Sequence, residues 1–175
     1  MAANPVVQEK LHEEIIQLLP DRKTKINFEE MPYLRAVLRE SLRITPVVPI
    51  TARILGPGLS FAGYNIDRKC WFVALNQFMS MSEKHYKDPQ EFRPERWIRG
   101  HTLKEDANPF VSLPFGHGPR MCIGKRYAEF EIQTLICKMV RNFKIGWPQE
   151  QPPLGYIPGF VNKPDNSVKL TLTER

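Results

Sequence analysis

The chain has 175 residues, of which 42% are hydrophobic and 25% are charged, and this composition excludes disordered and fibrous proteins. Its net charge of +6 would suit nucleic acid, anionic lipid or an acidic protein. The basic residues are scattered along the chain, so charge alone selects none of these partners. No run approaches the roughly 18 apolar residues that cross a bilayer, and the first ten residues lack a charged-then-apolar leader. We therefore expect neither a membrane anchor nor a targeting address in this stretch.

Two helices are predicted in the first quarter of the chain. Apolar residues recur at helical spacing over residues 5–19, and Pro20 closes this segment. A second helix is expected over residues 32–44, with Pro32 in its first turn and Pro46 after its end.

The middle of the chain changes character. Short apolar runs divided by glycines predict a small sheet over residues 47–81. Residues 82–114 are rich in proline, charge and aromatics without periodicity, which indicates a long irregular segment. The clearest helix is expected over residues 123–143, with an apolar stripe that must be buried. Alternating residues over 168–172, after turn signals at Pro158-Gly159 and Pro164, predict a terminal hairpin.

The cysteines exclude two common kinds of site. Cys70, Cys122 and Cys137 are odd in number and far apart, and they lack both CxxC spacing and a nearby pair of histidines. This pattern argues against a disulfide framework and against a structural zinc site. A reducing compartment fits best.

One of these cysteines lies in a distinctive loop. The segment FGHGPRMCIG places Cys122 directly before the third predicted helix. Metal ligation needs a thiolate, which a metal, a cation or a helix N-terminus can stabilise, and this helix supplies the last of these. Gly118 and Gly124 leave room for a large flat cofactor to approach the backbone. Arg120 offers a planar cation for a carboxylate, and Phe115 offers an apolar ring that would shield the sulfur from water.

The spacing F-x-x-G-x-R-x-C-x-G in this loop resembles the haem-binding signature of the cytochrome P450 family. A chance match in a chain of this length is on the order of 10⁻⁵ at average residue usage. An arbitrary cysteine is usually a small buried hydrophobe, but the complete pattern favours haem binding. The resemblance implies haem b (iron protoporphyrin IX) with Cys122 as the ligand of the iron. The other residues expected to contact this cofactor are Phe115, Gly118, Arg120 and Gly124.

Two shorter segments also resemble the family. Glu40 and Arg43 match its Glu-x-x-Arg helix, although such a pair alone is expected about once by chance in a chain this long. Arg96 lies in the segment RPERW, which resembles the family's later Pro-Glu-Arg segment. The resemblance implies that these three residues form a buried charge network that holds the irregular segment against the second helix. Arg53 matches a family position that places a cation on a haem propionate; the alternative is an ordinary arginine on a strand surface.

Four basic residues suggest a class within the family. Arg35 and Arg39 share one edge of the second helix, and Lys125 and Arg126 begin the third. Cations at these places resemble the mitochondrial class, which takes electrons from a small acidic iron–sulfur ferredoxin. The class implies the matrix side of the mitochondrial inner membrane and membrane association. The alternatives are plain solvated charges, and an endoplasmic-reticulum member reduced by a flavoprotein reductase.

The resemblance covers nearly the whole chain and matches about the last third of a typical family member. We therefore expect residues 1–175 to form the C-terminal haem-binding portion of the cytochrome P450 fold, mainly α-helical with small β-sheets. The family's Ala/Gly-Gly-x-Asp/Glu-Thr-Thr run, from the central helix that activates oxygen, does not occur in the sequence. The chain alone is therefore expected to be inactive, with no catalytic residue beyond the haem ligand.

The resemblance implies a haem-dependent monooxygenase that inserts one atom of O2 into a lipophilic, sterol-like substrate. Residues 47–51 and 156–160 correspond to family segments that line the substrate pocket, with plain core packing as the alternative. A truncated, non-catalytic haem-binding fragment is the second hypothesis. A basic nucleic-acid-binding module, which would bind no haem, is the third, and we expect no nucleic-acid partner.

Overall fold

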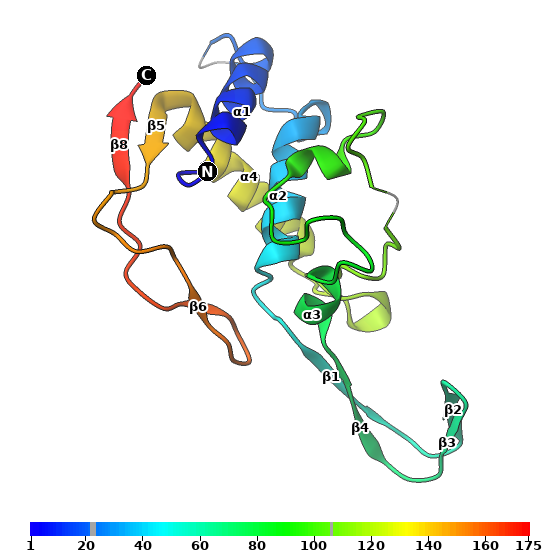
Figure 1. Cartoon of the computed structure of the whole chain (residues 1–175). Coiled ribbons are helices and arrows are strands. Elements are labelled where there is room, and N and C mark those ends of the chain that lie inside the picture. The colour runs from blue at the N-terminus through cyan, green and yellow to red at the C-terminus, as the bar shows by residue number, and fades with distance from the viewer. Residues whose placement is uncertain (22–23, 106) are drawn as a thin grey trace.

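Two helices from the first quarter of the chain and one from its last third form the body of the molecule (Figure 1). The computed structural model describes residues 1–21, 24–105 and 107–175. The helices are α1 (Pro5–Leu18), α2 (Pro32–Ile44) and α4 (Lys125–Asn142). All three predicted helices are confirmed, with α4 beginning at Lys125 rather than at residue 123. Proline opens α1 and α2, where its missing N–H costs no hydrogen bond.

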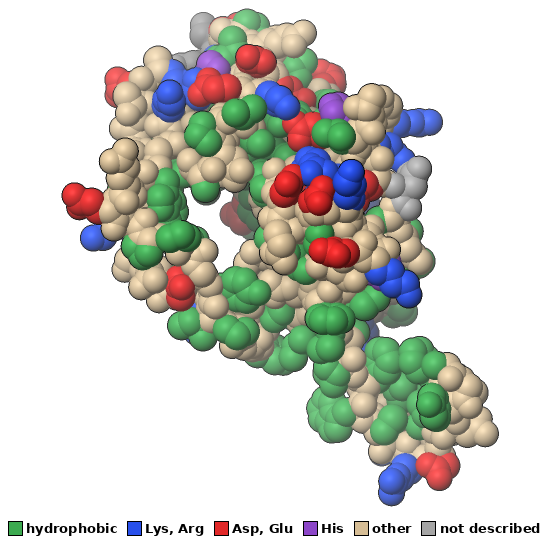
Figure 2. Space-filling model, in the orientation of Figure 1, with side chains coloured by type: hydrophobic (Ala, Val, Ile, Leu, Met, Phe, Trp, Pro, Cys, Tyr) green, Lys and Arg blue, Asp and Glu red, His purple; other side chains and the backbone are tan. Residues whose placement is uncertain are grey.

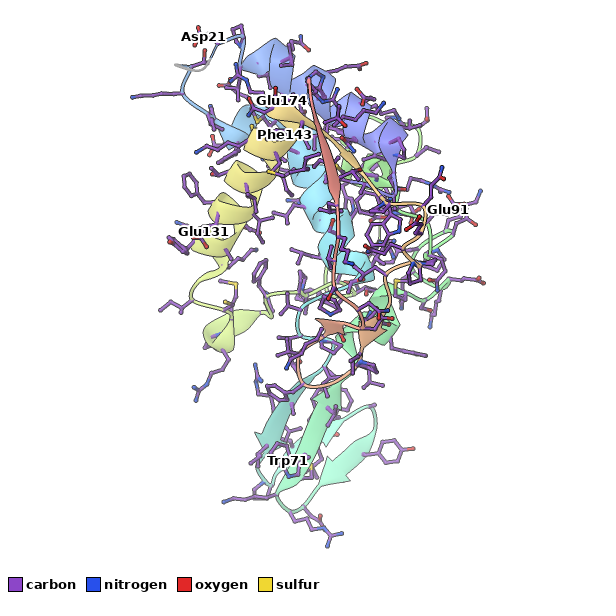
Figure 3. The ribbon with its side chains drawn as sticks, turned by 90° about the vertical axis from the view of Figure 1, so that its left-hand side faces the viewer. Asp21, Trp71, Glu91, Glu131, Phe143 and Glu174 are labelled. Carbon is purple, nitrogen blue, oxygen red and sulfur yellow. The ribbon has the colours of Figure 1, made fainter. Side chains whose placement is uncertain are left out.

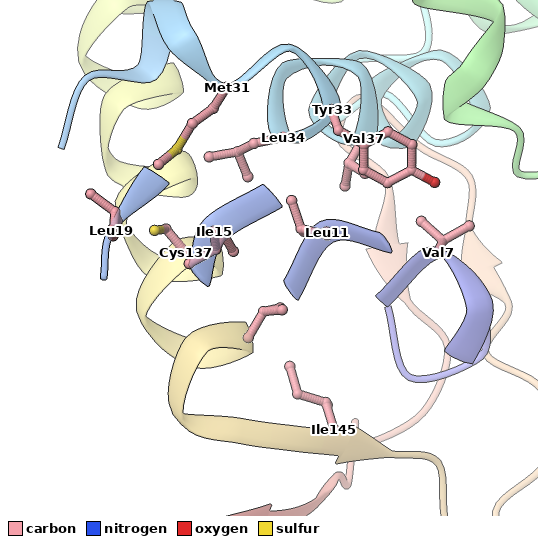
Figure 4. Close-up of a cluster of buried hydrophobic side chains, with 11 residues drawn as sticks. Val7, Leu11, Ile15, Leu19, Met31, Tyr33, Leu34, Val37, Cys137 and Ile145 are labelled. Carbon is pink, nitrogen blue, oxygen red and sulfur yellow. The ribbon is translucent and has the colours of Figure 1, made fainter. Parts of the chain in front are cut away.

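One apolar core joins the three helices (Figure 4). Leu11 and Ile15 of α1, Leu34 of α2 and Val140 of α4 are fully buried. Burying each such side chain stabilises the fold by about 1.5–3 kcal/mol. The rest of this cluster comprises Val7, Leu19, Met31, Tyr33, Val37, Cys137 and Ile145.

Two polar side chains of α1 strengthen these contacts. Glu14 accepts hydrogen bonds from the backbone N–H groups of Tyr33 (2.7 Å) and Leu34 (2.9 Å), at the start of α2. These amides have no partner inside their own helix, so Glu14 caps α2 from a neighbouring helix. Gln8 is buried and bonds through its amide to both the carbonyl and the N–H of Ile145.

A two-stranded arm projects from the helical body (Figure 1). Strands β1 (Thr51–Leu55) and β4 (Cys70–Ala74) pair antiparallel, and between them lies the hairpin of β2 (Leu59–Phe61) and β3 (Tyr64–Ile66). The small sheet predicted for residues 47–81 is confirmed. Its end is not a strand, however, because residues Asn76–Ser80 form the short helix α3. Hydrophobic side chains cover much of the arm (Figure 2), and Trp71 is largely exposed there.

Short 3-10 turns interrupt the remaining segments, at Phe28–Glu30, Pro94–Trp97 and Gly118–Arg120. Residues 82–105 and 107–114 are otherwise irregular, as the composition predicts. The turn at Pro94–Trp97 packs against α2 and thereby anchors this segment to the helical body.

The predicted terminal hairpin is wrong in its pairing. Strand β8 (Thr171–Glu174) pairs antiparallel with β5 (Phe143–Gly146), which directly follows α4. Phe143 and Glu174 lie opposite each other in this ladder (Figure 3). The local hairpin is a different one, formed by β6 (Tyr156–Ile157) and β7 (Lys163–Pro164). Alternation marks a strand but does not identify its partner, which here lies far back in the chain.

Within residues 1–21, 24–105 and 107–175, no helix combines the length and the apolar character that crossing a bilayer requires.

Candidate functional site

The cysteine loop is closed by its own backbone. The N–H of Cys122 donates to the carbonyl of Phe115 (2.9 Å), and the N–H of Gly116 donates to the carbonyl of Leu113 (3.0 Å). Gly116 and Gly118 adopt φ values of +73° and +74°, a conformation that side chains with a Cβ rarely take. The glycines are therefore required by the path of the backbone.

Space above the loop is open. An added Cβ at Gly118 would meet nothing within 4 Å, and one at Gly124 would lie 3.9 Å from the sulfur of Cys122, an ordinary contact. Cys122 is exposed, and so are its neighbours Met121 and Ile123. An exposed cysteine between two exposed apolar side chains is unusual, because free cysteines are among the most buried residues.

Helix α4 starts directly behind this cysteine. The carbonyl of Cys122 accepts from the N–H of Lys125 (3.3 Å), and that of Gly124 accepts from Ala128 (2.9 Å). The N-terminal, positive end of the helix therefore lies near Cys122. Phe115 is half-buried under the loop, whereas Arg120 is exposed.

The structure brings Glu40, Arg43 and Arg96 together, and the side chains of all three are fully buried. Arg43 forms a bidentate pair with Glu40, with both N–O distances 2.9 Å. Arg96 Nε donates to the same carboxylate, also at 2.9 Å. Because Arg96 belongs to the turn at Pro94–Trp97, this network ties the irregular segment to α2.

Three further residues complete the network, and sequence reasoning assigned no role to any of them. Trp97 Nε1 donates to Glu40 (2.8 Å), and Glu105 forms an ion pair with Arg96. The buried ring of Tyr86 lies 5.0 Å from the Arg43 guanidinium and 5.9 Å from that of Arg96, within the range of cation–π attraction. Trp97 follows Arg96 in the segment RPERW, but no pattern in the sequence indicates a role for Tyr86 or Glu105.

The carboxylate at the centre of the network stays ionised. Burial raises the pKa of Glu40, but hydrogen bonds from Arg43, from the backbone N–H of Arg93 and from Trp97 outweigh burial, so its pKa lies below the ordinary value.

The four basic residues of the predicted partner surface are divided by the structure. Arg39 and Lys125 line one hollow of about 180 Å³, which Phe115 and Trp97 also line. Arg35 is exposed on α2 and Arg126 on α4, and neither is among the residues that line this hollow. The hollow thus connects the buried network, the cysteine loop and two of the four cations.

Arg53 lies in the projecting arm, on strand β1. Its side chain is exposed and donates to the carbonyl of Ala52 (2.7 Å). No hydrogen bond or ion pair joins Arg53 to the cysteine loop within the described part of the chain.

The two apolar segments matched to a substrate pocket lie close to each other. The N–H of Asn162 donates to the carbonyl of Val47 (2.9 Å), and its side-chain amide donates to the carbonyl of Pro46 (2.8 Å). Asn162 is separated from residues 156–160 by Val161 alone, and Val47 begins residues 47–51. Val47, Ile157 and Phe160 are exposed, whereas Pro49 is buried.

The residues around Cys122 fit a haem. The exposed thiol supplies a soft ligand for iron, the open face of the glycine loop has room for a flat group, and exposed Met121 and Ile123 offer apolar contact. Arg120 is free of ion pairs with any described residue and is available for a carboxylate.

Comparisons with known proteins agree with this geometry. The model of the cytochrome P450 family matches residues 1–170. The chain is 36% identical over 179 residues to "Cytochrome P450 302a1, mitochondrial" of Drosophila melanogaster, covering 100% of this chain and 36% of that protein. It is 32% identical over 179 residues to "Sterol 26-hydroxylase, mitochondrial" of Homo sapiens, and this match covers 100% of the chain and 34% of that protein. It is 37% identical over 154 residues to "1,25-dihydroxyvitamin D(3) 24-hydroxylase, mitochondrial" of Mus musculus, and this match covers 87% of the chain and 29% of that protein.

The chain spans about a third of the length of the curated relatives that it matches. Within that span, the family model, the identities and the cysteine loop all lead to the same conclusion. The chain belongs to the cytochrome P450 family.

Proposed function

We propose that these residues are the C-terminal haem-binding portion of a haem-thiolate monooxygenase that oxidises a lipophilic, sterol-like substrate with O2. The observation that carries this proposal is the exposed Cys122, held by a closed glycine-containing loop at the start of α4. The names of two relatives, a sterol hydroxylase and a vitamin D hydroxylase, support the substrate class.

Each residue of the loop has a proposed task. The backbone hydrogen bond from Cys122 to Phe115 holds the sulfur in place, and Phe115 shields it from water. Gly118 and Gly124 keep the face of the loop free of side chains. Arg120, and Arg53 from the arm, would neutralise the propionates of the cofactor. When bound, a haem with a thiolate ligand supplies the activation of O2, because the thiolate donates electron density that favours O–O cleavage.

The oxidation itself requires groups that these 175 residues do not contain. No acid–alcohol run of the family's oxygen-activating helix occurs in the sequence, and oxygen activation in an open, wet site would release reduced oxygen. We therefore propose that the chain alone is inactive and that its network of Glu40, Arg43 and Arg96 serves the stability of the haem-binding portion.

We further propose a mitochondrial location, on the matrix side of the inner membrane, and a ferredoxin as the electron donor. The word "mitochondrial" in the names of relatives supports the location. Arg39 and Lys125, which line the hollow beside the cysteine loop, support an acidic donor. Arg35 and Arg126 would extend this positive surface along α2 and α4.

The test is the absorption spectrum of the reduced, carbon-monoxide-bound protein after haem reconstitution. It is recorded for the chain and for the longest natural polypeptide that contains it. We expect a red-shifted Soret band, typical of thiolate ligation, that disappears in Cys122→Ser. The matched control Cys70→Ser keeps the band, because Cys70 lies in strand β4 of the arm. A band in the longer polypeptide alone shows that the chain is too short to hold haem, and its absence from both contradicts the proposal.

A further inference from the structure

The buried charge network is unbalanced when only its three central members are counted. Glu40 contributes one negative charge, while Arg43 and Arg96 contribute two positive charges, and all three side chains have no solvent exposure. A buried charge without compensation is costly, because the protein interior solvates it poorly. A second carboxylate is therefore needed for neutrality.

Among the described residues, the other acidic side chains near the network are already engaged elsewhere. Asp88 and Glu91 are about half exposed or more and both pair with Arg93. Glu95 accepts from Lys10 and from the hydroxyl of Tyr33, on the side of α1. None of these three carboxylates pairs with Arg43 or Arg96.

Glu105 has the position that neutrality requires. One of its carboxylate oxygens pairs with Arg96 Nη1, and its side chain is only 19% exposed. The other oxygen accepts from the backbone N–H of Lys87 (3.2 Å). Its own N–H donates to the carbonyl of Arg96 (3.1 Å). Glu105 therefore joins three stretches of the irregular segment at a single point.

We infer that Glu105 is the charge-balancing fourth member of the network and a positioning residue for the cysteine loop. The stretch that begins at Glu105 runs directly into Phe115, whose carbonyl accepts the hydrogen bond from Cys122. A second connection runs through Trp97, which bonds to Glu40 and lines the same hollow as Phe115. The network thus holds Glu105, where this stretch begins, through Arg96. It also holds Trp97, which lines the same hollow as Phe115 at the end of the stretch.

This inference rests on the proposed function only where it concerns haem, so the test has one readout without haem and one with it. Glu105→Gln removes the charge at nearly constant volume, and Glu105→Asp keeps the charge on a shorter side chain. Glu150→Gln is the matched control, because Glu150 is exposed and has no ion pair with any described residue.

The first readout is amide hydrogen exchange in the haem-free protein. In Glu105→Gln, we expect exchange across residues 107–122 to accelerate by about tenfold or more, with a smaller change in Glu105→Asp and none in the control. Exchange in α1 should change less than exchange in the loop. Equal exchange in Glu105→Gln and the wild type would overturn the inference.

The second readout is the share of carbon-monoxide-bound haem that gives the thiolate-type band, measured at equal haem content and well below the unfolding temperature. We expect this share to fall in Glu105→Gln and to recover in part in Glu105→Asp. A lower unfolding temperature with an unchanged share would reduce Glu105 to a purely structural residue and overturn its positioning role. If neither the wild-type chain nor the longest natural polypeptide that contains it shows a thiolate band, the proposed function fails, while hydrogen exchange still decides the role of Glu105.

Discussion

Glu40 shows how a single carboxylate can organise a long irregular segment. It accepts hydrogen bonds from Arg43, from the backbone N–H of Arg93, from Arg96 and from Trp97. Three of these donors belong to the segment around the turn at Pro94–Trp97 and one to α2. Since a carboxylate has about four lone-pair sites, Glu40 has no acceptor capacity left for water.

The lowered pKa of Glu40 predicts how stability depends on pH. A carboxyl whose pKa is lower in the folded state than in the unfolded state stabilises the fold above the ordinary value of 4.5. This contribution is lost as the pH falls through the folded-state pKa. In Glu40→Gln, we expect the free energy of unfolding near neutral pH to drop by about 3–5 kcal/mol, because buried Arg43 loses its carboxylate and buried Arg96 keeps only Glu105.

Urea denaturation between about pH 7 and about pH 3 would measure this effect. The difference between wild type and Glu40→Gln should shrink as the pH falls below the ordinary value of 4.5, because the unfolded wild type then binds a proton that the folded carboxylate resists. A constant difference across the range would show that Glu40 does not titrate with folding. Glu150→Gln, at an exposed position, should follow the wild type throughout.

At the scale of elements, side chains rather than a strand join α1 to the β5–β8 sheet. Gln8 accepts from the N–H of Ile145 (2.7 Å) and donates to its carbonyl (2.9 Å). Strand β5 pairs with β8, so Gln8 supplies the hydrogen bonds that a further strand would make. The sheet can therefore end in the core beside α1 without leaving the buried backbone groups of Ile145 unsatisfied.

We expect Gln8→Leu to lower the free energy of unfolding by about 2 kcal/mol, because two buried backbone groups lose their hydrogen bonds. Gln17→Leu is the matched control, since Gln17 is an exposed glutamine on the same helix and its loss should cost less than about 0.5 kcal/mol. Urea unfolding midpoints of the two variants give the comparison. Equal shifts would mean that the bonds to Ile145 contribute nothing specific.

At the scale of the whole molecule, the effect of the net charge of +6 on a binding partner depends on where the charged side chains lie. Basic side chains are spread over the face seen in Figure 2, whereas Arg39 and Lys125 meet at the hollow beside the cysteine loop. Glu129 also lines this hollow, so two cations and one carboxylate leave it with a positive charge. Such a surface steers an acidic partner over about 10 Å at an ionic strength of about 0.1 M.

We expect Arg39→Glu to slow ferredoxin-supported reduction of the haem-loaded protein by about tenfold at low salt, and by less at high salt, where charges are screened. The control is Arg99→Glu, which makes the same change at an exposed arginine outside the hollow. Stopped-flow reduction rates at two salt concentrations would measure both variants. Similar rates for Arg39→Glu and wild type at both concentrations would contradict the ferredoxin proposal.

Local patterns in the sequence were sufficient for much of this architecture. Helical spacing predicted α1, α2 and α4, because each buries an apolar stripe whose period is visible in a short window. Glycines and short apolar runs predicted the arm. The motif around Cys122 identified the family, because its five specified residues fall within ten positions.

Contacts between distant parts of the chain had no such signal, and only the tertiary structure decided them. The partner of β8, the hydrogen bonds of Gln8 to Ile145 and the pairing of Arg96 with Glu105 are of this kind. The sequence by itself therefore determined the three long helices, the small sheet of the arm and the loop that carries the cysteine. The fold determined which side chains hold that loop in place, because the partner of a buried charge or of an open strand edge is the residue that tertiary packing places next to it.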